Sequence, residues 1–201
     1  MIIKHLGFEP KIDKSTFVAP TATICGNVEL GKNTRIMHGV SIVAEGSSIE
    51  IGDNCVILEN AVLRSTVKVN LKIGNNVLIG PHAHLAGCTI EDNVFIATGA
   101  SVFHGAKLCK NSEVRINGVV HLKTVLPENT TVPIGWIAVG DPVKILPPDQ
   151  HEEIWAIQKP LNFPEFVYGI KRKDDGDSIM PEITQMMSEA LKSHIDDEII
   201  E

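Results

Sequence analysis

The sequence of 201 residues is poor in aromatic residues, which make up 4% of it, and it has no apolar run long enough to span a membrane. Its first ten residues, MIIKHLGFEP, lack the apolar core of a signal peptide. The formal net charge is −7 and the basic run at 171–173 is short, whereas phosphate binding relies on clustered Lys and Arg. We therefore expect a cytoplasmic protein with no nucleic-acid partner and no membrane partner.

A period of six residues is the main feature that the sequence does contain. Residues 73–120 read IGNNVL, IGPHAH, a five-residue LAGCT, then IEDNVF, IATGAS, VFHGAK, LCKNSE and VRINGV. Each unit opens with Ile, Leu or Val, and most have a small residue at the fifth place. This period fits neither a helix nor a simple alternating strand. It predicts an all-β fold, a left-handed parallel β-helix of hexapeptide repeats, in which three units form one coil of a triangular prism.

The repeat also predicts where the prism begins and ends. Units start at Val18, and the register slips at 43–50 and 66–72, where we expect loops that project from corners of the prism. The repeat decays after Val120 into a strand-like stretch with Pro and Gly. We therefore assign residues 1–146 to the β-helix domain.

Residues 147–201 are predicted to be a helical extension that packs on or caps the prism. Asp149 followed by Glu152 resembles the capping box that begins a helix, and Trp155 is expected to pack on the prism. After a polar break at 171–178, a second helix is expected with Pro181 in its first turn.

The four cysteines are far apart and form no C-x-x-C pair. This spacing argues against a zinc ribbon, and in a chain without an export signal it favours free thiols. Cys55 falls at the fifth place of its unit, so we expect it in the core. The other three are expected to be surface or interface thiols: Cys25, Cys88 and Cys109.

The phase of the repeat assigns residues to faces of the prism. Because three units form one coil, every third unit lies on the same face. The second-place residues of one such face should point outward, one above another: Arg64, Ala86, Phe103 and His121. The third-place residues of the next face should form a similar stack: Glu59, Pro81, Thr98 and Ile116.

Two stretches, IGPHAHLAGCTIEDNVFIATGASV from Ile79 and AVGDPVKI from Ala138, carry a resemblance to the γ-class carbonic anhydrases over residues 17–145. In that family three histidines bind a metal ion at a subunit boundary. Two stack one coil apart on one subunit and the third comes from its neighbour, and an open coordination position holds the water that is activated. The resemblance implies a homotrimer with a cleft between subunits.

Placed on this sequence, the family's stacked pair falls at Arg64 and Ala86 and the third ligand at Pro81, so none is a histidine. Other polar positions of the family's site fall at Val43, Ala44, Glu45, Leu58 and Glu59. A guanidinium cannot ligate a cation, so we expect Arg64 to pair with Glu45 or Glu59, or to hold an anionic ligand in the intersubunit cleft. The resemblance thus implies a divergent small-ligand-binding or non-catalytic member with a degenerate zinc site.

A second interpretation is an active metalloenzyme whose ligands have moved. His82 and His84 are two residues apart, hence on one side of an extended segment, and a neighbouring subunit can add His104 or His121. Such a site would hold Zn²⁺, or Fe²⁺ or Co²⁺ in its place. The candidate catalytic residues around the cleft are Glu45, Glu59, Arg64 and His104.

A third interpretation is a hexapeptide acyltransferase, because that family shares the prism, the trimer and an ending similar to GDPVKI. Acetyl-coenzyme A would lie in the groove between two subunits, and a histidine would act as general base. The candidate bases are His38, His82, His84 and His104. The basic residues available for the coenzyme's phosphates are Lys107, Lys110, Arg115 and Lys144.

Overall fold

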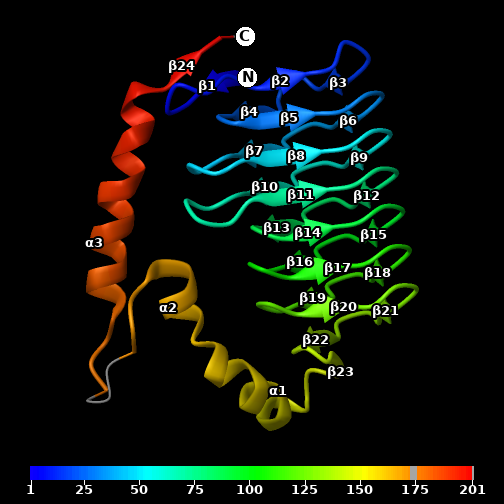
Figure 1. The fold of residues 1–201 in the computed structure, drawn as a ribbon, viewed down its shortest axis with the longest axis vertical. Coiled ribbons are helices and arrows are strands. Elements are labelled where there is room, and N and C mark those ends of the chain that lie inside the picture. Colours follow the sequence, from blue (N-terminus) through cyan, green and yellow to red (C-terminus); the bar gives the residue numbers. More distant parts are fainter. Residues whose placement is uncertain (173–175, 201) are drawn as a thin grey trace.

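The computed structural model describes residues 1–172 and 176–200, and it confirms the predicted parallel β-helix (Figure 1). One face is a ten-stranded sheet in the order β23 (Lys144–Leu146), β22 (Ile137–Val139), β19 (Val119–Val120), β16 (Ser101–Val102), β13 (His84–Ala86), β10 (Val62–Arg64), β7 (Ser41–Val43), β4 (Thr23–Cys25), β1 (Ile2–Lys4) and β24 (Glu198–Ile199). Neighbours in this sheet lie one coil apart in the chain, except at its two ends.

The other two faces are sheets of seven strands each. One contains β2 (Lys11–Ile12), β5 (Val28–Leu30), β8 (Ile49–Ile51), β11 (Leu71–Ile73), β14 (Thr89–Ile90), β17 (Lys107–Leu108) and β20 (Val125–Leu126). The other contains β21 (Thr131–Val132), β18 (Glu113–Val114), β15 (Phe95–Ile96), β12 (Leu78–Ile79), β9 (Val56–Ile57), β6 (Arg35–Ile36) and β3 (Phe17–Val18). All their pairs are parallel, as expected when each coil repeats the path of the last.

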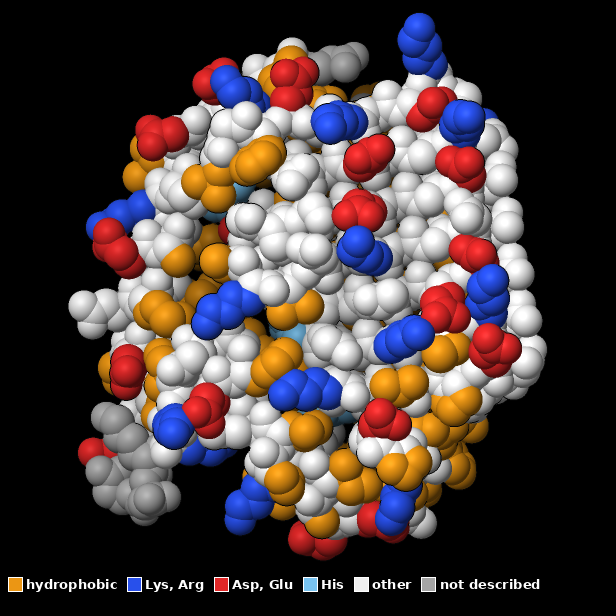
Figure 2. Space-filling view, in the orientation of Figure 1, with side chains coloured by type: hydrophobic (Ala, Val, Ile, Leu, Met, Phe, Trp, Pro, Cys, Tyr) orange, Lys and Arg blue, Asp and Glu red, His pale blue; other side chains and the backbone are white. Residues whose placement is uncertain are grey.

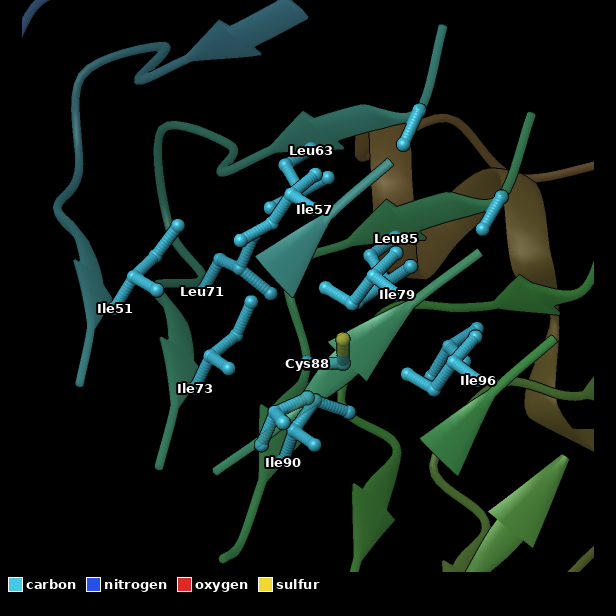
Figure 3. Close-up of a cluster of buried hydrophobic side chains, with 14 of the residues drawn as sticks. Ile51, Ile57, Leu63, Leu71, Ile73, Ile79, Leu85, Cys88, Ile90 and Ile96 are labelled. Carbon is cyan, nitrogen blue, oxygen red and sulfur yellow. The ribbon is translucent and has the colours of Figure 1, made fainter. Parts of the chain in front are cut away.

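The core of the prism is built from the first and fifth places of each unit. First-place Ile79 and Leu85 and fifth-place Ala83 and Ala100 are all fully buried. Figure 3 shows first-place side chains one coil apart lying beside one another, such as Ile57 and Ile79. Each fully buried aliphatic side chain contributes about 1.5–3 kcal/mol. Because every coil offers the same narrow interior, the core uses aliphatic and small residues.

The fourth place of a unit forms a corner with a left-handed backbone. Asn93 and Gly99 have φ of 61° and 67° there, as suits residues that tolerate this conformation. From residue 33 to residue 135, the positive-φ residues that are neither Asn nor Gly are His82 and Lys123. One corner also carries a ladder of amides, in which Asn93 Nδ2 donates to Asn111 Oδ1 at 3.2 Å.

The two predicted loops are confirmed as the long connections between β7 and β8 and between β10 and β11, at residues 44–48 and 65–70. They are in contact: the Ser47 hydroxyl in the first loop donates a hydrogen bond to the Thr66 carbonyl in the second at 2.6 Å. Both connections border the cavity described below.

The C-terminal part contains α1 (His151–Gln158), η1 (Lys159–Leu161), α2 (Phe163–Tyr168), α3 (Met180–Ala190) and η2 (Leu191–Asp196). The predicted capping box at Asp149 is wrong, because α1 begins two residues later and Gln150 makes no side-chain cap hydrogen bond. Ile154 is buried in α1, whereas Trp155 stays 38% exposed. The sequence did not indicate α2, which is too short to show a helical period.

The helix predicted around Pro181 is confirmed as α3, with Pro at its first turn. Figure 1 shows α3 running back along the prism to the first coil, where β24 pairs antiparallel with β1. Part of the predicted polar break, residues 173–175, lies outside the described residues. The division into domains at residue 146 stays a prediction. Within residues 1–172 and 176–200, no helix is both long and apolar enough to cross a bilayer.

Candidate functional site

A cavity of about 490 Å³ lies between the ten-stranded sheet and the C-terminal helices. On the prism side it is lined by residues of β10, β13 and the 65–70 connection, and on the other side by residues of α2 and α3. Figure 2 shows hollows between the helices and the prism, with pale-blue histidine atoms inside them. The chain's own C-terminal helices therefore cover the face on which we expected an intersubunit cleft.

Arg64 lies in the wall of this cavity. It is the register partner of Ala86 in the next coil, which confirms the predicted stack of second-place residues. Its guanidinium forms an ion pair with Glu45, one of the two partners considered from the sequence. The other, Glu59, lies at the turn between β9 and β10 and does not line the cavity. A paired guanidinium and a buried alanine offer no ligand to a metal ion, so zinc does not fit at the family's position.

His84 and His104 also line the cavity. Burial lowers the pKa of His84, and the positive charge of Arg64 adds to this effect. Burial likewise lowers the pKa of His104, with His84 as a second cause. Within the described part of the chain, His104 Nδ1 is buried without a hydrogen-bond partner. The structure thus brings together four of the candidate residues: Glu45, Arg64, His84 and His104.

His82 lies elsewhere than the sequence reasoning assumed. The premise that His82 and His84 share one side of an extended segment is wrong, because His82 forms a corner with φ of 58° and is exposed. The signal was present in the sequence, since His82 occupies the fourth place of its unit. His121 lies against Phe103, with 5.8 Å between ring centroids, and does not line the cavity.

The predicted stack of third-place residues is confirmed at a second corner. The His82 N–H donates to the Glu59 carbonyl at 3.0 Å, and the Gly99 N–H donates to the Pro81 carbonyl at 2.9 Å. These bonds place Glu59 and Pro81 one above the other. Pro81 has no ionisable side chain, so it cannot take the role of the family's third ligand.

The basic residues considered for coenzyme phosphates are engaged in ion pairs. Lys107 Nζ lies 2.8 Å from Glu91 Oε1, and Lys144 Nζ lies 2.8 Å from Glu153 Oε1. Lys110 and Arg115 pair with Asp92 and Glu113. Figure 2 shows acidic and basic side chains interspersed over the sheet that holds β5 to β17, with no basic patch on that face.

Two of the cysteine predictions are wrong. Cys25 and Cys88 are buried, and only Cys109 is partly exposed. Cys88 belongs to the unit of five residues; counted back from Ile90 it occupies the fifth place, which explains why it points into the core (Figure 3). Cys25 lies at an outward place of its unit, but the returning C-terminal segment covers it, and its Sγ lies 3.9 Å from Asp197 Oδ2.

Sequence reasoning missed one group of residues altogether. His5, Cys25, His194 and Asp197 meet where the C-terminal segment returns to the first coil, and one ligand atom from each lies within 4.8 Å of all the others. His5 and His194 stack with ring centroids 4.2 Å apart. Their separation of nearly the whole chain length hid this cluster from any local pattern.

Comparison with known proteins agrees with this geometry. Residues 70–104 match the family described as bacterial transferase hexapeptide (six repeats). The mitochondrial γ-carbonic anhydrases 2 and 1 of Arabidopsis thaliana are 32% and 31% identical, over 75% and 82% of this chain and 54% and 66% of their own length. The chain thus spans about half to two thirds of these curated relatives.

Among solved structures, a hexapeptide transferase family protein from Anaplasma phagocytophilum is 28% identical with a TM-score of 0.52, covering 84% of this chain and 97% of that one. The shared repeat accounts for this likeness, since both the γ-carbonic anhydrases and the hexapeptide transferases use such prisms. The relatives with the higher identity carry the γ-carbonic anhydrase name. The chain therefore belongs to the γ-carbonic anhydrase-like family of hexapeptide-repeat proteins.

Proposed function

We propose that this γ-carbonic anhydrase-like protein binds a small carboxylate in the cavity beneath α2 and α3, and that it does not hydrate carbon dioxide at the family's metal position. The observation that carries this proposal is Arg64, a cation that stands where the resemblance expects a metal ligand and that lines the cavity. A guanidinium offers five N–H donors, and within the described residues its only hydrogen bond is to Glu45. Donors therefore remain for a second carboxylate.

The histidines favour the same ligand. His84 and His104 have lowered pKa values, so at neutral pH they are uncharged and each can donate one N–H without adding charge. The Nδ1 atom of His104 is buried without a hydrogen-bond partner, and a bound molecule could supply that partner. Arg64 supplies the charge and the histidines supply orientation.

The opposite wall sets the shape of the ligand. Phe166, Tyr168, Met186 and Met187 line the helical side of the cavity, and its volume lies within the range usual for small-molecule sites. An inorganic anion such as bicarbonate would leave this apolar wall without a contact. A carboxylate with a short apolar chain would place its head at Arg64 and its chain against α2 and α3.

Calorimetric titration with hexanoate, and separately with bicarbonate, tests the proposal. We expect hexanoate to bind more tightly, and Arg64→Ala to weaken it at least about tenfold, because a hydrogen bond to a charged group contributes about 1.5–3 kcal/mol. Arg115→Ala is the matched control, since Arg115 pairs with Glu113 outside the cavity. Equal affinity of the wild type and Arg64→Ala, or chelator-sensitive hydration of carbon dioxide, would overturn the proposal.

Self-association as a homotrimer is the second part of the proposal, and it rests on the family. Large hydrophobic side chains exposed on the prism and near its end support it, among them Leu78, Ile116 and Ile134. Figure 2 shows hydrophobic side chains gathered over β21 to β23 and α1. Sedimentation equilibrium of the full chain should give three times the monomer mass of 21.9 kDa, and a monomer at micromolar concentration would contradict it. A cytoplasmic location stays a prediction from the sequence.

A further inference from the structure

The cluster of His5, Cys25, His194 and Asp197 lies near the end of the prism, and Glu45 separates it from Arg64 at the family's metal position. It is the only group of at least three potential ligands that converges in this way within residues 1–172 and 176–200. We propose that these four side chains bind a divalent transition metal ion of the zinc class. His5 follows β1 in the first coil, Cys25 ends β4 one coil further along the chain, and His194 and Asp197 come from the segment that follows α3.

The four side chains lie around Asp197, whose two oxygens contact the other three residues. His5 Nδ1 lies 2.6 Å from Asp197 Oδ1, His194 Nδ1 lies 2.8 Å from Asp197 Oδ2, and Cys25 Sγ lies 3.9 Å from the same oxygen. Around zinc, with bonds of about 2.0 Å to nitrogen or oxygen and about 2.3 Å to sulfur, ligand atoms lie about 3.3–3.6 Å apart. The ligand atoms of the cluster lie within 4.8 Å of one another, so movements of about 1 Å would complete the coordination.

The charges of the four groups match a divalent ion. A Cys25 thiolate and the Asp197 carboxylate carry one negative charge each and neutral imidazoles carry none, so with a divalent cation the site has no net charge. This matters because His5 and Cys25 are almost completely buried, and an uncompensated charge there would be costly. Without the ion, burial and the charges of Asp197 and Glu45 raise the pKa of the Cys25 thiol to about 12. Metal binding would displace that proton to solvent.

The residues around the cluster support His194 as a ligand. Its Nδ1 faces Asp197, and its Nε2 lies 3.3 Å from Glu45 Oε2. A ligating histidine usually has its second ring nitrogen held by a carboxylate in this way. Glu45 is itself held by Arg64, so the cluster is joined to the wall of the cavity through two side chains.

The ligand types select the metal. Two nitrogens, one sulfur and one oxygen suit zinc or cobalt, whereas calcium and magnesium require mainly oxygen ligands. With four protein ligands the site would be closed, as in structural zinc sites, so we assign it no catalytic role. The ion would join the first coil to the end of α3 and so hold that helix over the cavity.

The test uses Co²⁺ as a spectroscopic probe on the full chain, purified without a histidine tag and freed of metal with a chelator. Wild type should show a thiolate-to-cobalt charge-transfer band in the near ultraviolet, together with visible bands of tetrahedral cobalt, and Zn²⁺ should displace both. Cys25→Ser should lose the charge-transfer band. Cys109→Ser should keep it, because Cys109 is the partly exposed thiol far from the cluster in the repeat.

Because Cys25 is buried and its substitution can destabilise the fold, a second variant changes a ligand on the C-terminal side. His194→Gln leaves the prism core untouched, since the His194 side chain is partly exposed, and it should lose tight Zn²⁺ binding and the rise in Tm that Zn²⁺ gives the wild type. Glu45→Gln should weaken the affinity by about 10–100-fold. Absence of the cobalt bands in wild type, a band that depends on Cys109, or unchanged Zn²⁺ affinity in His194→Gln would each overturn the proposal.

Discussion

Substitution of His82 tests whether this residue is needed only for the left-handed corner of the backbone or also for ligand or metal binding. His82 has φ of 58°, in the left-handed region where most residues cost about 1–2 kcal/mol and where Asn and Gly are tolerated. We expect His82→Asn to leave the free energy of unfolding unchanged within about 0.5 kcal/mol or to raise it. His82→Val should lower it by about 1–2 kcal/mol, because a β-branched side chain is poorly accommodated there.

These changes are measurable in a protein of this size. One kcal/mol corresponds to a shift in Tm of about 2–4 °C for a domain of this length, so His82→Val should melt about 2–8 °C lower. Urea unfolding followed by circular dichroism gives the free energies, and titration with Zn²⁺ and hexanoate on the same samples gives the affinities. Both affinities should stay at the wild-type value in His82→Asn.

Two results would refute this reasoning. A loss of more than about 1 kcal/mol in His82→Asn would mean that the imidazole makes contacts beyond those of an exposed corner. A loss of metal affinity in the same variant would revive the interpretation in which His82 is a ligand. His84→Asn is the comparison, because His84 lines the cavity and its substitution should alter hexanoate binding.

Three further outcomes follow from the structure. Leu85→Ala should lower the free energy of unfolding by about 2–5 kcal/mol in urea denaturation, because Leu85 is fully buried in the prism. Burial lowers the pKa of His84, His104 and His121, whereas Asp197 and Glu45 raise the pKa of His194, so near pH 6.5 three histidines bind more protons in the unfolded chain and one binds more in the native state. The free energy of unfolding should therefore fall as the pH drops from about 7.5 to about 5.5, and a flat profile would contradict this. Asn93→Ala should cost about 1 kcal/mol more than Asn93→Gly, because Gly keeps the corner with its φ of 61° and only Ala is strained there; equal Tm values would exclude this explanation.

The numbering of the repeat carried much of the prediction. It identified Ile79 and Leu85 as core residues and placed Arg64 above Ala86, and both results are confirmed. It failed at Cys88, because LAGCT has five residues and the place of Cys88 in its unit differs when counted from Leu85 or back from Ile90. The same numbering places His82 at the fourth position of its unit, which indicates a corner and not an extended segment.

The repeat predicted only one side of the candidate site. The prism side of the cavity, with Arg64 and His84, follows from which face each strand residue occupies. The helical side, with Phe166 and Met187, comes from a segment that has no repeat and whose docking position depends on the packing of α3 along the prism. No local pattern reports such packing, because it joins residues that lie far apart in the chain.

The sequence by itself determined the β-helix, its core and its outward stacks, because a six-residue period repeats the same local environment in every coil. Through the resemblance it also predicted that Arg64, Ala86 and Pro81 stand at the family's three ligand positions. Only the tertiary structure decided what covers those positions, since the C-terminal segment returns across nearly the whole chain to pair β24 with β1. That return covers the face of the prism on which Arg64 lies, forms the cavity that Arg64 lines, and brings His194 and Asp197 to His5 and Cys25.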